Sequence, residues 1–176
     1  MATVVYQVGD GISTDVIYPG RYMATVLPTE TPQYAFADAA DFNATLKAQQ
    51  VPPGSVIVAG KNFGCGSAME IAALVIRGAG IPVVLARSFA RAFYRNGINN
   101  GLLLVAMETG SIQEGDVLLI SANTTEVVCE NLTRIARVVL PPLAPALMDI
   151  IAAGGLVEFV RRYGRFPVEG SGVSGY

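Results

Sequence analysis

The sequence predicts an α/β fold with a parallel βαβαβ core and additional short antiparallel strands. Short apolar runs occupy positions 55–59, 83–86 and 102–106, and helical patterns fill the intervals at 68–76 and 90–99. Strands that alternate with helices at this spacing are typical of a parallel sheet. After residue 110 the apolar runs are short and closely spaced, at 117–120, 126–129 and 135–140. This second pattern favours antiparallel strands.

The remaining elements flank this core. Residues 4–7 read as a first strand, followed by a glycine-rich loop up to residue 15. Residues 34–50 have short helical character, 144–153 form an amphipathic helix, and 156–163 close the domain. We expect a single domain over residues 1–165 and a flexible tail over 166–176, because the end of the chain is rich in glycine and serine.

Composition narrows the possible classes of protein. Of the 176 residues, 52% are hydrophobic and 15% are charged, so we expect an exposed apolar surface that serves a partner. The 12 Lys and Arg residues form no long cluster, which argues against nucleic-acid binding. The most apolar stretch, 138–157, is interrupted by three prolines and Asp149, so we expect no membrane span. The N-terminus has no basic region typical of a signal peptide, and we expect a cytoplasmic protein.

The cysteine count bears on cofactors. The chain has two cysteines, Cys65 and Cys129, and no histidine. A cubane iron–sulfur cluster generally needs three or four thiolates, and zinc prefers clustered cysteine and histidine. We therefore expect no metal or other cofactor on this chain, and any metal in the chemistry belongs to a partner. Cys65 is either a small packing residue in its loop or a reactive thiol.

The segment 59–70 is the most informative part of the chain. Gly64 and Gly66 allow positive φ and close backbone approach, so several N–H groups can converge on one point. Ser67 follows them and is expected at the start of the helix 68–76. There it is either a helix N-cap or a nucleophile or anion site stabilised by unpaired N–H groups. Ser88 is likewise expected to cap the helix 90–99.

Three motifs give the chain a family resemblance. They are residues 9–22 (GDGISTDVIYPGRY), 60–67 (GKNFGCGS) and 87–102 (RSFARAFYRNGINNGL). Together they resemble the small subunits of 3-isopropylmalate dehydratase, the swivelling-domain branch of the aconitase superfamily, over residues 4–163. The resemblance implies a swivelling β/β/α domain and a role in leucine biosynthesis. It also implies a large subunit that carries a [4Fe-4S] cluster, with the active site formed between the two chains around a small dicarboxylate substrate.

The resemblance also assigns roles to residues. Ser67 matches the serine that acts as catalytic base in the family, and positions 21–27 match the loop that selects the substrate. Arg91 belongs to a segment that packs near the glycine loop in the family. The substrate-binding residues implied in this way are Gly64, Cys65, Gly66, Ala68, Met69, Arg21, Tyr22, Met23 and Arg91.

One departure from the family matters for function. The family loop continues Gly-Ser-Ser-Arg-Glu-His, whereas this chain has Ala68, Met69 and Ile71. Met69 cannot imitate the bidentate grip of arginine on a carboxylate, and Arg21 is the candidate to replace it. Two hypotheses follow. The chain is a hydro-lyase subunit for 3-isopropylmalate or a related alkyl malate such as citramalate or dimethylmalate, or it is a non-catalytic paralogous small subunit that serves assembly or regulation.

Overall fold

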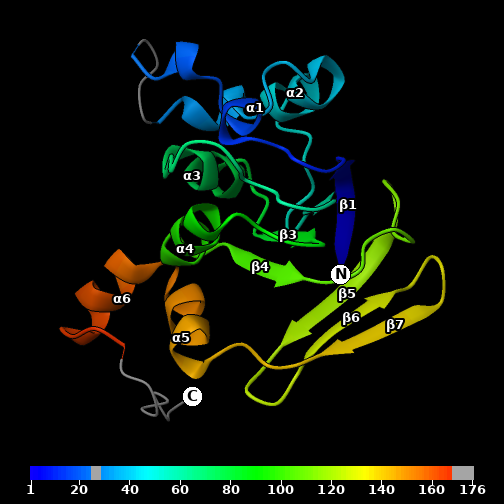
Figure 1. Ribbon diagram of the computed structural model, residues 1–176, viewed down its shortest axis with the longest axis vertical. Coiled ribbons are helices and arrows are strands. Elements are labelled where there is room, and N and C mark those ends of the chain that lie inside the picture. The colour runs from blue at the N-terminus through cyan, green and yellow to red at the C-terminus, as the bar shows by residue number, and fades with distance from the viewer. Residues whose placement is uncertain (25–28, 168–176) are drawn as a thin grey trace.

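A computed structural model describes residues 1–24 and 29–167, and it contains one seven-stranded sheet (Figure 1). The strand order is β4-β3-β2-β1-β5-β6-β7. Four neighbouring strands are parallel: β1 (Ala2–Gln7), β2 (Val56–Ala59), β3 (Val83–Ala86) and β4 (Leu103–Ala106). An antiparallel meander continues the sheet from β1 with β5 (Val117–Ala122), β6 (Val127–Asn131) and β7 (Ala136–Leu140). The predicted fold class is confirmed.

Helices connect and cover the parallel strands. The helix α3 (Ile71–Gly78) joins β2 to β3, and α4 (Arg91–Asn99) joins β3 to β4, which completes the predicted βαβαβ unit. Shorter elements follow β1, namely α1 (Thr14–Ile17), the 3-10 helices η1 (Gly20–Tyr22) and η2 (Thr31–Tyr34), and α2 (Ala40–Lys47). After the meander, α5 (Pro145–Ala153) and α6 (Leu156–Tyr163) pack against each other beside α4 (Figure 1).

The core has two parts, one on each face of the sheet. The side chains of Ile57 and Ala59 belong to the cluster that also contains α3 and α4 residues, whereas Val56 and Val58 belong to the cluster beneath the meander. All four β2 residues are therefore buried. A strand covered on both faces reads as a continuous apolar run rather than an alternating one, which explains why this segment was recognisable in the sequence.

The start of α3 differs from the sequence-based expectation. A helix over 68–76 was expected, but α3 begins at Ile71, and its N-cap is Glu70. Residues 67–69 instead form a turn in which the Met69 N–H donates to the Ser67 carbonyl at 2.8 Å. The expected helix boundary is therefore wrong by three residues. Most of the other expected elements lie within two residues of the observed ones, but the helical stretch expected at 34–50 shortens to α2 at Ala40–Lys47.

A buried carboxylate supports the turn before β5. Asp116 is 3% exposed, and its Oδ2 accepts hydrogen bonds from Asn131 Nδ2 at 2.7 Å and Arg134 Nε at 2.7 Å. The Gln113 N–H donates to the same oxygen at 2.9 Å. Burial alone raises the pKa of the Asp116 carboxyl, but these three hydrogen bonds outweigh it and hold the pKa below its usual range.

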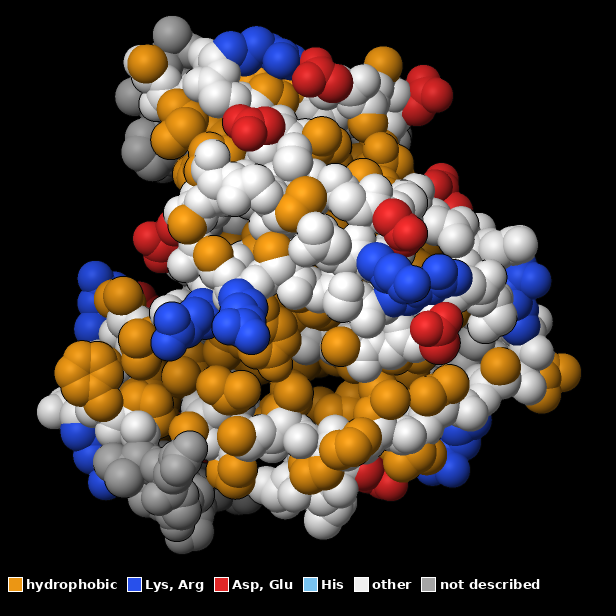
Figure 2. Space-filling view, viewed as in Figure 1, with side chains coloured by type: hydrophobic (Ala, Val, Ile, Leu, Met, Phe, Trp, Pro, Cys, Tyr) orange, Lys and Arg blue, Asp and Glu red, His pale blue; other side chains and the backbone are white. Residues whose placement is uncertain are grey.

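The surface has an apolar region over the C-terminal half of the chain. Large exposed hydrophobic side chains include Leu119, Ile135, Val138 and Val139 of the meander. Figure 2 shows hydrophobic side chains gathered over the lower part of this face, where Figure 1 places α5 and the meander. In the part of the chain that the structure describes, no helix is both long and apolar enough to cross a bilayer. The predicted flexible tail lies outside the described residues from position 168 onward.

Candidate functional site

The loops that follow β1, β2 and β3 meet at the carboxyl edge of the parallel strands. Two isolated parallel bridges extend the pairing beyond the strands, one between Ser13 and Cys65 and one between Phe63 and Phe89. The loop after β2 therefore lies between the other two. Ligand sites of parallel sheets form at this edge, so the glycine loop occupies the position expected for a functional site.

Hydrogen bonds from the first loop hold the glycine loop along most of its length. The Asp10 carboxylate accepts from the Lys61 N–H at 2.7 Å, and the Ile12 carbonyl accepts from the Gly64 N–H at 2.8 Å. Thr14 makes the next two bonds, from its N–H to the Cys65 carbonyl at 2.8 Å and from its hydroxyl to the Ser67 carbonyl at 3.0 Å. The glycine loop is therefore fixed by a segment more than 50 residues earlier in the chain.

Both glycines adopt the conformation expected of them. Gly64 has φ +77° and Gly66 has φ +90°, in the left-handed region that favours glycine. A Cβ on Gly64 would lie 2.1 Å from Cγ of the buried Phe93 ring, whereas a Cβ on Gly66 would meet its nearest atoms at 3.5 Å. Gly64 is therefore required for close packing as well as for backbone conformation, and Gly66 for conformation alone.

Ser67 is exposed and is not a helix cap. It lies three residues before Glu70, the N-cap of α3, and no side chain caps that helix. The N-cap alternative for Ser67 and its expected place at the helix start are therefore wrong, because the Thr14 bond and the turn to Met69 keep this segment out of the helix. Among the described residues, the Ser67 hydroxyl and the N–H groups of Gly66, Ser67 and Ala68 find no hydrogen-bond partner. These groups remain available to a ligand.

The residues after Ser67 lead into α3. Ala68 is exposed, Met69 is half-buried, and Ile71 is half-buried against the first core cluster. The Glu70 carboxylate accepts a hydrogen bond from Asn100 Nδ2 at 3.0 Å, which ties the start of α3 to the end of α4. Met69 and Ile71 therefore bring apolar side chains into the segment that follows the exposed serine.

Arg21 is already engaged by a carboxylate. Its guanidinium donates to Asp38 through two hydrogen bonds, one of them from Nη1 to Oδ2 at 3.2 Å. It also lies over the Tyr22 ring, 4.7 Å from the ring centroid. The hydrogen bond to Asp38 is the main cause that raises the pKa of Arg21 and lowers the pKa of Asp38. Met23 is 57% exposed, and positions 25–27 of the predicted specificity loop lie outside the described residues.

Arg91 lines a separate pocket at the same edge. This pocket has a volume of about 600 Å³ and is lined by Ser88, Phe89, Arg91, Tyr94, Arg95 and Ala106. Burial raises the pKa of the Tyr94 hydroxyl. Ser88 does not cap α4, whose N-cap is Ala90; its hydroxyl accepts from the Asn62 N–H at 2.9 Å instead. The structure therefore brings Gly64, Cys65, Gly66, Ser67 and Met69 into one loop but gives Arg91 a pocket that none of them lines.

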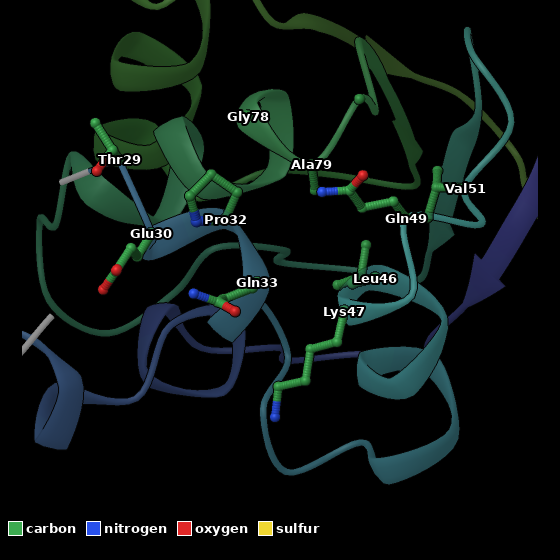
Figure 3. A pocket seen from close by; sticks show the side chains of 11 residues that line it. Thr29, Glu30, Pro32, Gln33, Leu46, Lys47, Gln49, Val51, Gly78 and Ala79 are labelled. Atoms are coloured by element: carbon green, nitrogen blue, oxygen red, sulfur yellow. The ribbon is translucent and has the colours of Figure 1, made fainter. Parts of the chain in front are cut away.

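A second hollow lies between η2, α2 and the C-terminal end of α3. Its volume is about 450 Å³. Figure 3 shows Pro32, Gln33, Leu46 and Gln49 arranged around it. Its lining shares no residue with the loops at the carboxyl edge. It therefore forms no part of the candidate site around Ser67.

The cysteines do not form a ligand set. Cys129 is buried in the second core cluster, and burial raises the pKa of its thiol. Cys65 is half-buried, and its Sγ donates to the Gly11 carbonyl at 3.3 Å. Within residues 1–24 and 29–167, no three His, Cys, Asp or Glu side chains are grouped so that they could hold a metal ion. The described residues therefore do not fit an iron–sulfur cluster.

Comparison with known proteins identifies the family of this chain. Residues 11–110 match the family described as the aconitase C-terminal domain. A 3-isopropylmalate dehydratase small subunit from Desulfovibrio desulfuricans is 42% identical over 158 residues, which cover 89% of this chain and 92% of that relative. The chain belongs to the 3-isopropylmalate dehydratase small-subunit family.

Other members of the family carry different names. An isopropylmalate/citramalate isomerase small subunit from Methanocaldococcus jannaschii is 40% identical over 90% of this chain and 92% of its own length. A methanogen homoaconitase small subunit from the same organism is 40% identical over 89% of each chain. A crystal structure of 3-isopropylmalate dehydratase from M. jannaschii matches with a TM-score of 0.79 and 36% identity, covering 92% of this chain and 93% of that one. The swivelling-domain fold implied by the sequence is confirmed.

Sequence reasoning missed three residues that organise the site. Thr14 and Asp10 hold the glycine loop, and Asp38 holds Arg21. The first two lie in the motif 9–22, so the motif itself was a signal, but nothing in it showed which side chains face the glycine loop. Asp38 lies in no recognised motif and carried no signal.

Proposed function

We propose that this chain is the small subunit of an aconitase-type hydro-lyase. It acts on 3-isopropylmalate or a related alkyl malate by dehydration and rehydration. The observation that carries the proposal is the Ser67 loop, in which an exposed hydroxyl without a partner follows two positive-φ glycines at the carboxyl edge of the sheet. Free N–H groups beside it suit an anion. This subunit supplies the serine base and the substrate-selecting loop.

In this proposal Ser67 acts as an alkoxide that removes the proton from the carbon next to a substrate carboxylate. A serine is a weak base in water, so its anion must be stabilised by the surrounding dipoles. The N–H groups of Gly66, Ser67 and Ala68 are free to do this. Because the structure places Ser67 outside α3, these loop amides matter more than the helix dipole, whose effect falls off within one turn.

The substrate is expected to carry an alkyl group. Met69 and Ile71 place apolar side chains where the family has arginine and histidine, and an unpaired substrate charge beside them would be costly to desolvate. Arg21 and Arg91 are the candidates to hold a carboxylate, with Tyr22 and Met23 beside Arg21. Arg21 would have to share its guanidinium with Asp38, whereas neither Arg91 nor Arg95 makes an ion pair in the described part of the chain. This difference favours Arg91.

The partner is expected to be a large subunit that bears a [4Fe-4S] cluster, with the complex in the cytoplasm. When bound there, the cluster iron would supply the Lewis acid that takes the departing hydroxyl. The exposure of Ser67 supports a shared site, because an alkoxide needs a water-excluded environment that this chain alone does not provide.

Reconstitution with the large subunit tests the proposal. The wild-type complex should turn over at least one of 3-isopropylmalate, citramalate and dimethylmalate. Ser67→Ala should lower kcat by about 10²- to 10⁴-fold, the usual contribution of a general base. Ser121→Ala, at an exposed serine on β5, is the matched control and should leave kcat unchanged. Turnover that survives Ser67→Ala would exclude this serine as the base.

A second candidate function rests on the same departure from the family motif. The loss of both arginine and histidine at Met69 and Ile71 favours a paralogous subunit that binds the large subunit without catalysis. Tight complex formation without turnover of any of the three alkyl malates would support an assembly or regulatory role.

A further inference from the structure

We infer that Thr14 is the positioning residue that fixes Ser67 for proton abstraction. The inference rests on the proposed role of Ser67. The Thr14 hydroxyl donates to the Ser67 carbonyl at 3.0 Å, across 53 residues of sequence. This is the last contact between the first loop and the glycine loop before the chain turns toward α3.

In the described part of the chain, the Thr14 hydroxyl is the only side chain that forms a hydrogen bond with Ser67. The Ser67 hydroxyl has no hydrogen-bond partner among the described residues, so the direction of the side chain follows from the backbone. That backbone follows Gly66, which has φ +90° and on which a Cβ would meet its nearest atoms, those of Ser13 and Thr14, at 3.5 Å. The Ser67 carbonyl accepts two hydrogen bonds, one from Thr14 and one from the Met69 N–H in the local turn. Of these two hydrogen bonds, only the one from Thr14 connects Ser67 to another part of the fold.

Thr14 is itself held firmly. Its side chain is 1% exposed, and its N–H donates to the Cys65 carbonyl at 2.8 Å. Ser13, the N-cap of α1, pairs with Cys65 in a parallel bridge and accepts from the Val16 N–H through its hydroxyl. Burial and these backbone bonds hold Thr14 in place, so the tether on Ser67 is anchored in the folded core.

We expect loss of the Thr14 hydroxyl to slow the chemical step and to leave substrate binding unchanged. Thr14 is 1% exposed and so lies beneath the part of the loop that a substrate can reach, and its loss should leave substrate affinity unchanged. A displacement of about 1 Å in a reacting group can cost about 10²-fold in rate. Thr14→Val keeps the shape of the side chain and removes only the hydroxyl. In the reconstituted complex it should lower kcat by about 10- to 100-fold and leave KM within about threefold. Thr14→Ser restores the donor and should recover most of kcat.

Thr109 provides the matched control. Its hydroxyl also donates from a buried position to a backbone carbonyl, that of Ala59, at 2.8 Å. Thr109→Val therefore removes the same kind of bond, but from a strand residue rather than from Ser67. It should leave kcat near the wild-type value. An equal fall in kcat for both valine variants, or no rescue by Thr14→Ser, would overturn the inference.

The thiol of Cys65 gives a readout that needs no turnover. Cys65 is half-buried two residues before Ser67, and Cys129 is buried, so alkylation of the full chain reports on the glycine loop. Losing one hydrogen bond should raise the Cys65 alkylation rate by about 2- to 10-fold in Thr14→Val, and Thr109→Val should not change it. An unchanged rate in Thr14→Val would overturn the inference. If the wild-type complex turns over no alkyl malate, the proposed function fails. The comparison of alkylation rates then tests by itself whether Thr14 holds the Ser67 segment in place.

Discussion

Replacing each loop glycine with alanine should separate backbone conformation from packing. At Gly66, alanine has room, since the nearest atoms would lie at 3.5 Å, so the cost is that of a left-handed L-residue, about 1–2 kcal/mol. At Gly64, the same conformational cost applies, and the new Cβ would lie 2.1 Å from Cγ of Phe93. The Phe93 ring is 1% exposed and packs edge-on against Phe63 with centroids 5.2 Å apart, so it has little room to move. Overpacking of this kind costs about 1–3 kcal/mol more.

Urea unfolding of the two variants would measure this difference. Gly64→Ala should lose about 2–5 kcal/mol of the free energy of unfolding, and Gly66→Ala about 1–2 kcal/mol. The unfolding slopes should agree with the wild type, so that the midpoints can be compared directly. Equal midpoints, or a larger loss at Gly66, would show that the contact between the glycine loop and the Phe93 ring is not what makes Gly64 necessary.

The remaining predictions concern charge. Met69→Arg should tighten binding of 3-isopropylmalate to the reconstituted complex by about 10- to 100-fold, the value of a charge-assisted hydrogen bond. If Arg91 or Arg21 already supplied this charge, the variant would bind no more tightly, and replacing that arginine with alanine would abolish binding instead. Because the pKa of Asp116 is lower in the folded chain than its ordinary value of 3.8, its stabilising effect is complete above about pH 4 and is lost as pH falls through the lowered pKa. Unfolding measured between pH 6 and pH 2.5 should therefore depend less on pH in Asp116→Asn, and an identical pH dependence would contradict this.

The sequence was enough to predict the order of the core elements. The runs at β2 and β3 are apolar throughout because both faces of these strands are buried, and this continuous pattern is hard to mistake. The end of the helix expected at 144–153 was also predictable, since Gly154 follows it and adopts positive φ at the C-cap of α5. In each case the signal lies within a few residues of the feature that it predicts.

The features that the sequence did not predict depend on distant partners. The helix pattern after Gly66 gave no reason to delay α3 until Ile71, because the bond that holds Ser67 out of the helix comes from Thr14. Similarly, Arg21 was expected to be free for a substrate, and only the fold shows Asp38 beside it. Local propensity sets the type of each element here, and contacts across the loops set where the functional segment begins and ends.

The hydrogen bonds of the loop residues divide this segment into a part that the fold holds and a part that it leaves open to change. The motif is intact up to Ser67, the last residue that the first loop holds. Beyond it, the altered positions 68, 69 and 71 carry side chains that are exposed or half-buried, whereas the unaltered Glu70 is bound by Asn100. At these three positions a new side chain would disturb no hydrogen bond that the described residues make. Positions 68, 69 and 71 are therefore suitable targets for directed evolution of substrate preference. They follow the serine closely in sequence, and changing their side chains leaves the hydrogen bond from Thr14 to Ser67 in place.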